Sequence, residues 1–74
     1  MSIKEVEKIM EDYRERALDE NDPNGKARDI WNASVYVISC YILFKGNPIK
    51  NIKYAYRLVK KMRKLEKLME GEKF

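Results

Sequence analysis

Residues 41–64, YILFKGNPIKNIKYAYRLVKKMRK, decide the fold of this 74-residue chain. An apolar run ends at Gly46, and a segment dense in lysine and arginine begins after Pro48. Glycine is favoured just past the end of a helix, and proline is favoured in the first helical turn. Asn47, which stands between them, is a suitable N-cap. The stretch therefore predicts two helices joined by a tight turn, which makes them antiparallel neighbours.

The segment from about residue 48 to residue 70 has the pattern of an amphipathic helix. Its apolar residues recur three or four positions apart, the spacing that places side chains on one face. The expected core face consists of Ile52, Ala55, Leu58, Val59, Met62, Leu65 and Met69. Basic residues recur at the same spacing on the opposite side of this helix. This basic stripe consists of Lys50, Lys53, Arg57, Lys60, Lys64 and Lys67.

The segment from about residue 26 to residue 44 is apolar on most of its circumference. Trp31 lies on its broadest apolar face, and we expect this side chain in the core. The opposite side begins polar and becomes apolar toward the turn. Two neighbouring helices from one small chain cannot cover that much apolar surface. The side chains left over, which we expect to form an interface beyond the monomer, are Tyr36, Leu43 and Phe44.

The N-terminal segment, from about residue 2 to residue 19, predicts a helix with a narrow apolar stripe. Ser2 followed by Glu5 has the spacing of a capping box, which favours a helix start at this point. The segment leads into Asn21-Asp22-Pro23-Asn24-Gly25, a run of residues that favour turns. A loop is therefore expected between this helix and the apolar one.

These elements predict an all-α fold, with residues 1–74 forming one domain built as an up-down-up three-helix bundle. The apolar helix is central and the basic amphipathic helix is last. The alternative is a long helical hairpin whose N-terminal helix docks on a second chain. A core from 74 residues is marginal, and a single cysteine without any histidine excludes an internal disulfide and a Cys/His zinc site. We therefore expect a homodimer.

The composition, with 38% charged and 45% apolar residues, is that of a folded chain. The sequence has no signal-peptide pattern and no run of about 20 apolar residues, so we expect a cytoplasmic protein without membrane contact. Its richness in lysine, glutamate and isoleucine hints at a thermophile. It has neither a glycine-rich phosphate loop nor a histidine to activate a nucleophile, so we expect no enzyme and no cofactor or metal.

The charge is distributed unevenly along the chain. The net charge is +4, yet residues 48–70 alone carry eight basic and two acidic side chains. Like charges one helical turn apart repel each other, so the basic stripe lowers helix stability unless an anion binds it. A nucleic-acid backbone or an acidic protein surface would offset this repulsion. The third interpretation is a solvated face that only keeps the protein in water.

The nucleic-acid interpretation has the most detail. The start of the basic helix combines amide and basic side chains, which suit contacts with phosphates and base edges. The layout of helix, glycine turn and basic helix resembles a helix-turn-helix motif, with Gly46 and Ile52 at matching positions. Ile42 and Lys45 depart from that pattern, so we expect the helix to lie along phosphates rather than in a groove.

Two tyrosines near the start of the basic helix are aromatic groups on which unpaired bases could stack. Of these, Tyr56 is expected to pack beside the apolar face, which leaves Tyr54 as the stacking residue. The alternative function is a protein–protein interaction module, such as a helical inhibitor or an assembly subunit, without nucleic-acid contact. The predicted nucleic-acid-binding residues are Asn47, Lys50, Asn51, Lys53, Tyr54, Arg57, Lys60, Lys61, Lys64 and Lys67.

Overall fold

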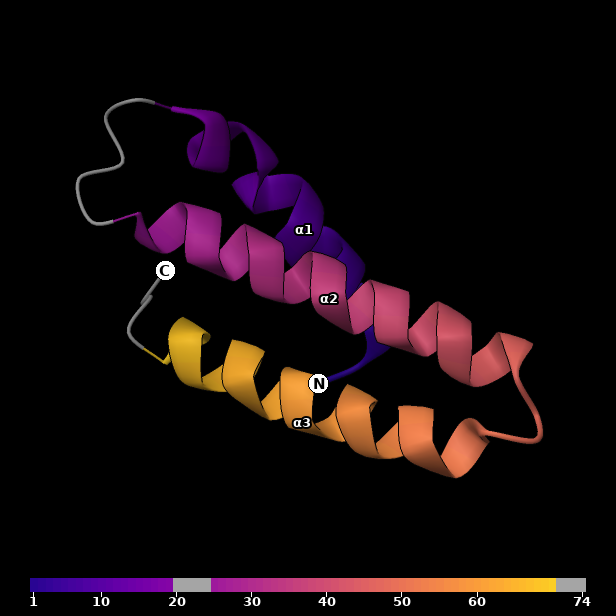
Figure 1. Ribbon diagram of the computed structural model, residues 1–74. Helices are drawn as coiled ribbons and strands as arrows, with labels where there is room; N and C mark the ends of the chain where they lie inside the picture. The colour runs from indigo at the N-terminus through magenta and orange to yellow at the C-terminus, as the bar shows by residue number, and fades with distance from the viewer. Residues whose placement is uncertain (20–24, 71–74) are drawn as a thin grey trace.

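The computed structural model describes residues 1–19 and 25–70 (Figure 1). Its helices are α1 (Ile3–Leu18), α2 (Lys26–Gly46) and α3 (Asn51–Met69). The prediction of an all-α fold with three helices packed as a bundle is confirmed. Most of the predicted first loop, residues 21–24, lies outside the described residues.

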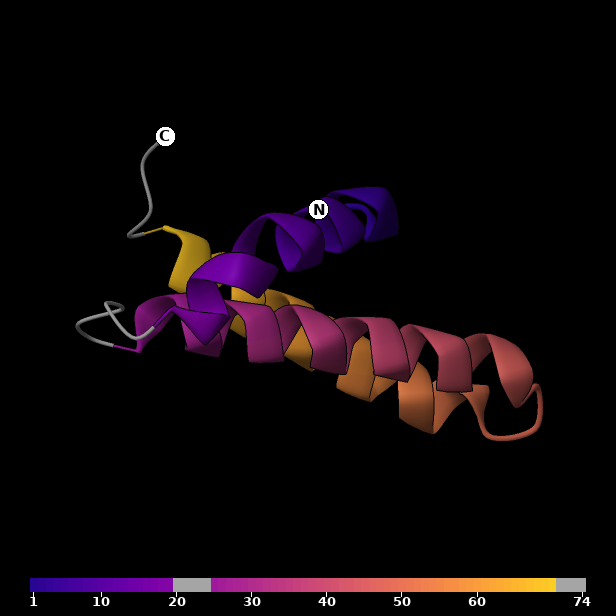
Figure 2. The same cartoon turned by 90° about the horizontal axis from the view of Figure 1, so that it is seen from above.

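The central element is α2, which packs against both other helices. It runs antiparallel to α3, and the two form a long hairpin, while α1 lies obliquely across the first half of α2 (Figures 1 and 2). The molecule is elongated, with extents of 44 × 20 × 18 Å. The N-terminal end of α1 lies at the middle of the hairpin, where it overlaps α2 in Figure 1 and stands off from it in Figure 2. Among the described residues, no third helix therefore covers the half of the hairpin that adjoins the turn.

The start of α1 follows the predicted capping pattern. Ser2 is the N-cap, and its Oγ accepts a hydrogen bond of 3.2 Å from the backbone N–H of Glu5. This bond satisfies one of the amide groups that a helix leaves unpaired at its start. At the other end, the N–H of Asp19 donates to the carbonyl oxygen of Arg16 at 3.2 Å. The predicted helix of residues 2–19 is thus observed with its two end residues acting as caps.

Replacing Ser2 by alanine should lower the free energy of unfolding by about 1 kcal/mol, because the N–H of Glu5 loses its partner. Urea unfolding followed by circular dichroism measures this change. The control is Ser39→Ala at an exposed position inside α2, where alanine is the better helix former and stability should be unchanged or slightly higher. Equal losses in the two variants would contradict a capping role for Ser2.

The connection between α2 and α3 differs from the prediction. We expected Gly46 just past the end of the apolar helix, but α2 continues through Gly46 and α3 begins only at Asn51. Asn47 was expected to cap the start of α3, yet it caps the end of α2, where its Nδ2 donates to the carbonyl oxygen of Leu43 at 3.0 Å. An amide side chain that satisfies a terminal carbonyl makes a left-handed glycine unnecessary at this end.

The left-handed glycine occurs at the other end of α2. Gly25, with φ 62°, is the only residue with positive φ in the described part of the chain, and it precedes the first turn of α2. A non-glycine residue would be strained in this conformation.

Apolar side chains point in most directions from α2, but no helix of the described residues is long and apolar enough to cross a membrane.

The hydrophobic core joins all three helices, and its α2 residues lie between Ala27 and Val37. Ser34 is buried beside it, and its hydroxyl donates to the carbonyl oxygen of Trp31 at 2.6 Å. Trp31 itself is only partly buried and packs against the edge of the core, which corrects the expectation of a core position. The buried core residues are Val6, Tyr13, Ala27, Ile30, Ala33, Val37 and Leu65.

The predicted core face of α3 is wrong at two positions. Leu65 is fully buried, and three further predicted residues (Leu58, Met62 and Met69) pack against the core. Ile52, however, is 84% exposed and Val59 is 48% exposed. Their spacing is that of a buried face, but α1 crosses the hairpin obliquely and does not extend over the half of α3 that adjoins the turn (Figure 2). Periodicity therefore identified the apolar side of α3, and the absence of a covering layer leaves its first half exposed.

Candidate nucleic-acid interface

The basic stripe occupies the side of α3 that is turned away from the core. All six of its side chains are exposed. From Lys50 to Lys67 the stripe extends roughly 25 Å, because an α-helix rises about 1.5 Å per residue. Helix α3 and its N-cap residue, Lys50, thus hold six cations at regular intervals along one edge of the molecule.

Glu66 is the only acidic residue of α3, and it does not interrupt the stripe. Its carboxylate oxygen Oε1 lies 3.8 Å from the α-amino nitrogen of Met1, just before the start of α1. Because Glu66 is about half exposed, this ion pair contributes little to stability. It does show which side of α3 faces α1. Viewed along the axis of α3, the stripe side chains project about 100–200° away from the direction of Glu66.

The predicted nucleic-acid-binding residues near the start of α3 do not form a single exposed cluster. The side-chain amide of Asn47 donates a hydrogen bond to the carbonyl oxygen of Leu43. Asn51 and Tyr54 are half-buried, and Tyr54 lines a small pocket of about 230 Å³ together with residues of the turn. Lys50 and Lys53 are exposed, so these cations are the accessible part of the predicted group.

Lys61 faces α2 rather than the outer edge of α3. Its Nζ lies 5.1 Å from the centroid of the Tyr36 ring, a cation–π contact between the two helices of the hairpin. Lys61 is half-buried and lines a groove of about 340 Å³ between α2 and α3, which also includes Asp29 and the stripe residue Lys64. Lys61 therefore contributes to hairpin packing, whereas the stripe residue Lys64 borders the same groove but stays exposed.

The two tyrosines of α3 differ from the prediction in their exposure. Tyr56 is 71% exposed, whereas Tyr54 is half-buried. Tyr56 lies between the basic stripe and the side that faces α1, in the part of the hairpin that α1 does not cover. Sequence reasoning missed this exposed aromatic ring because the spacing of apolar residues in α3 does not tell how far the N-terminal helix extends over it.

The predicted interface residues lie on the side of the hairpin away from α1. Tyr36 and Leu43 are exposed, while Phe44 is half-buried. Tyr36 follows Trp31, which faces α1, by five residues, and its side chain therefore projects about 140° away from that direction. Leu43 follows Tyr36 by seven residues and shares its face.

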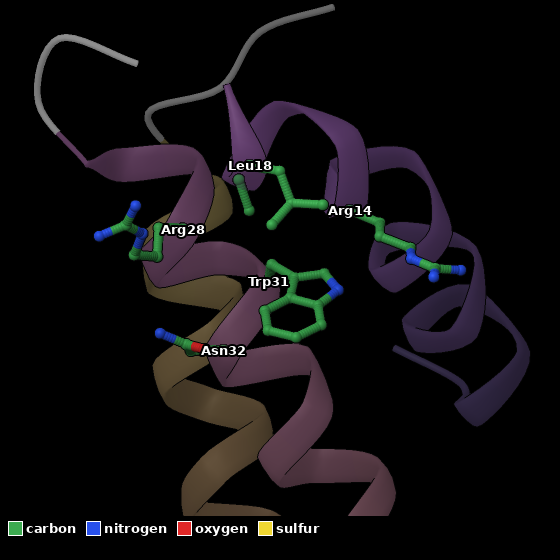
Figure 3. Close-up of a pocket in the computed structure, with 6 residues that line it drawn as sticks. Arg14, Leu18, Arg28, Trp31 and Asn32 are labelled. Atoms are coloured by element: carbon green, nitrogen blue, oxygen red, sulfur yellow. The ribbon is translucent and has the colours of Figure 1, made fainter. Parts of the chain in front are cut away.

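A pocket with a volume of about 500 Å³ lies between α1 and α2 (Figure 3). Trp31 stands at its centre below Leu18, which explains why the tryptophan is not fully buried. The side chains of Arg14 and Arg28 extend away from Trp31 on opposite sides, so the pocket does not combine them into an anion site. In the described residues, no group of three or more His, Cys, Asp or Glu side chains is arranged to hold a metal ion.

Lys45 adds a cation at the turn end of the hairpin. Its Nζ lies 5.1 Å from the centroid of the Tyr41 ring. A hydrogen bond with Tyr41, followed by the charge of that side chain, raises the pKa of Lys45 above its ordinary value.

The chain matches none of the protein families, curated proteins or solved structures with which it was compared. Its function is therefore inferred from the surface of α3 and from the arrangement of the three helices.

Proposed function

We propose that this protein is a small, non-enzymatic accessory or regulatory protein that binds nucleic acid through the basic stripe of α3. The observation that supports this proposal is the row of six exposed cations along one edge of α3, which begins at the N-cap residue Lys50. A nucleic-acid backbone is a regular row of negative charges surrounded by condensed counterions. Neutralising several phosphates at once releases these counterions, which drives binding and also relieves the repulsion between neighbouring lysines.

In this proposal α3 lies along the backbone and does not enter a groove as a recognition helix. A helix-turn-helix places its two helices at about 90–120°, whereas α2 and α3 lie antiparallel side by side (Figure 1). Lysine and arginine contacts to phosphate carry no sequence information, so binding is non-specific. Tyr56 adjoins the stripe and is exposed, which favours single-stranded partners whose unpaired bases can stack on the ring.

The test is fluorescence anisotropy with labelled double-stranded DNA, single-stranded DNA and RNA at two or more salt concentrations. We expect micromolar or tighter binding at low salt that weakens steeply as salt is added. If all six stripe cations contact duplex phosphates, the logarithm of the affinity should fall with the logarithm of salt concentration with a slope of about −5. Absence of binding at low salt would overturn the proposal.

A second candidate function is a protein–protein interaction module, such as a helical inhibitor or an assembly subunit. It is favoured by the exposed apolar side chains on both faces of the hairpin, among them Tyr36 on one face and Ile52 on the other. In that case an acidic protein surface would be the partner of the basic stripe. A salt-sensitive complex with an acidic protein, without any nucleic-acid binding, would support this alternative.

We also propose that the protein works as a homodimer. Its core is small, and a domain of this size gains stability when a second copy covers apolar surface. Exposed apolar side chains lie on two faces of the hairpin. One face carries Tyr36 and Leu43 with the half-buried Phe44, and the other is the side that α1 covers only in part.

A further inference from the structure

We infer that the groove between α2 and α3 binds one unpaired base of a single-stranded nucleic acid. This inference rests on the proposed function and names the class of nucleic acid that the protein prefers. The groove, which we term the hairpin groove, includes Asn32 and Tyr36 of α2 and Lys61 and Lys64 of α3. Its volume of about 340 Å³ is within the range of about 300–1,000 Å³ that is typical of small-molecule pockets.

The hairpin groove adjoins the basic stripe. Lys64 belongs to both, because it is one of the six exposed stripe cations and also lines the groove. Lys60 and Lys67, the stripe residues on either side of Lys64, lie about 6 Å and about 4.5 Å from it along the helix axis. Lys61 precedes Lys64 by three residues, so its side chain projects about 60° away from that of Lys64. A strand whose phosphates follow the stripe therefore passes along the edge of the groove.

Tyr36 supplies an aromatic ring at this groove. The Nζ of Lys61 lies over the ring at 5.1 Å from its centroid, and this contact restrains the ring before any ligand binds. A ring held in place in advance loses less conformational entropy on binding. Tyr36 is 59% exposed, so ring surface remains for a base to stack on. Stacking tolerates any sequence, because every base has a π-face.

The α2 side of the groove carries polar groups that suit a base better than a phosphate. Asn32 precedes Tyr36 by four residues, so the two side chains are neighbours on one face of the helix. The Asn32 side chain is exposed and extends away from Trp31 (Figure 3). Its amide both donates and accepts hydrogen bonds, as the edges of bases do. Asp29 also lines the groove, and its carboxylate repels a phosphate.

Only an unpaired base can enter the hairpin groove. In a duplex, a base must be unpaired and unstacked, at a cost in free energy, before it can leave the helix. A duplex therefore contacts the stripe alone, whereas a single strand combines phosphate contacts with stacking on Tyr36. We expect single strands to bind more tightly than duplexes at salt concentrations that weaken the phosphate contacts.

The hairpin groove and Tyr56 flank the stripe on opposite sides. Tyr56 and Lys61 are five residues apart, so they project about 140° from each other, with the stripe between them. Bases on either side of a backbone that follows the stripe can therefore meet an aromatic ring. The groove requires an accessible Tyr36, so this inference excludes a dimer that pairs through the face of Tyr36 and Leu43.

The test measures, by fluorescence anisotropy, binding of a labelled single strand of deoxycytidines and of an abasic strand of equal length. The abasic strand has the same phosphates but no bases, so the unmodified protein should bind it at least about fivefold more weakly. Tyr36→Ala should weaken binding of the deoxycytidine strand by at least about fivefold and leave binding of the abasic strand and of duplex DNA unchanged.

Two control variants accompany this measurement. Tyr36→Phe keeps the aromatic ring and should keep the affinity. Leu43→Ala removes an exposed apolar side chain from the same face of α2 but outside the groove lining, and it should bind as the unmodified protein does. Circular dichroism confirms that each variant is helical, and sedimentation equilibrium confirms that its oligomeric state is unchanged.

A second groove variant, Asn32→Ala, repeats the test at an exposed position where truncation leaves the core intact. It should weaken binding of the deoxycytidine strand by about threefold, because the base edge loses a hydrogen-bond partner, and should spare the abasic strand. Unchanged binding of both strands would contradict the contact of Asn32 with a base.

The remaining outcomes separate the groove from the stripe. No binding of any nucleic acid would overturn the proposed function and the groove together. Equal, salt-sensitive binding of the deoxycytidine and abasic strands would overturn the groove and leave the stripe. A preference for bases that survives Tyr36→Ala would assign the stacking to Tyr56 and overturn the groove. Equal losses on both strands in Tyr36→Ala, or dissociation of a dimer, would place Tyr36 in packing or in the dimer interface and would also overturn it.

Discussion

Replacing Lys53, Arg57 and Lys60 by glutamine is expected to weaken nucleic-acid binding by about tenfold or more at low salt. Binding to duplex DNA should also depend less steeply on salt. The slope of the logarithm of affinity against the logarithm of salt concentration should become less negative by about 0.9 for each lost phosphate contact, which is about three for the triple variant. Glutamine has a helix propensity close to that of lysine and arginine, so α3 should stay intact. Anisotropy titrations at several salt concentrations measure both quantities.

The matched control removes the same number and kind of cations from α1, as Lys4→Gln, Lys8→Gln and Arg14→Gln. Each variant loses three positive charges, so the two variants have equal net charge. The three side chains of α1 are exposed, as are those in the stripe. If the stripe is the binding surface, the control should lose little affinity and keep the original slope. Equal losses in the two variants would mean that only net charge attracts the nucleic acid, and the assignment of the stripe would fail.

Features governed by neighbouring residues could be predicted from the sequence. The cap at Ser2 depends on a hydroxyl and an amide three residues apart, and it forms as expected. The exposure of Lys53 and its partners in the basic stripe likewise follows from the spacing of charges around one helix. These features need no knowledge of where the other helices lie.

Features that depend on the reach of another helix could not be predicted in this way. Ile52 and Val59 have the spacing of core residues, but the oblique path of α1 leaves them uncovered. Tyr56 is exposed for the same reason, and Tyr54 is not. Periodicity identifies the apolar side of a helix, whereas burial requires a second element at the same level along its axis.

The turn shows a different limit. Asn47 can cap the start of one helix or the end of another, and both uses satisfy an unpaired backbone group. The sequence places Asn47 before Pro48, which favours a helix start, but the side chain reaches back to the carbonyl oxygen of Leu43. The Asn47 side-chain amide was predicted to contact nucleic acid, and in the structure it caps the C-terminal end of α2. Local propensity alone did not decide between these two hydrogen-bond partners.

Replacing Leu65 by alanine is expected to unfold most of the protein at moderate temperature. Leu65 is fully buried, and it is the only fully buried side chain that α3 contributes to the core. Truncation of a buried leucine to alanine costs about 2–5 kcal/mol, which is comparable to the whole stability of so small a domain, about 3–5 kcal/mol. Thermal unfolding followed by circular dichroism should show a lost or strongly lowered transition.

Two further variants separate this effect from a general sensitivity to losing apolar side chains. Leu18→Ala, at an exposed position, should change the free energy of unfolding by no more than about 0.5 kcal/mol. Trp31→Ala should have an intermediate effect, because one side of the ring already faces an open pocket and its removal leaves less of an enclosed cavity. A Trp31→Ala variant less stable than Leu65→Ala would mean that the tryptophan, rather than the packing of Leu65 in the core, holds the three helices together.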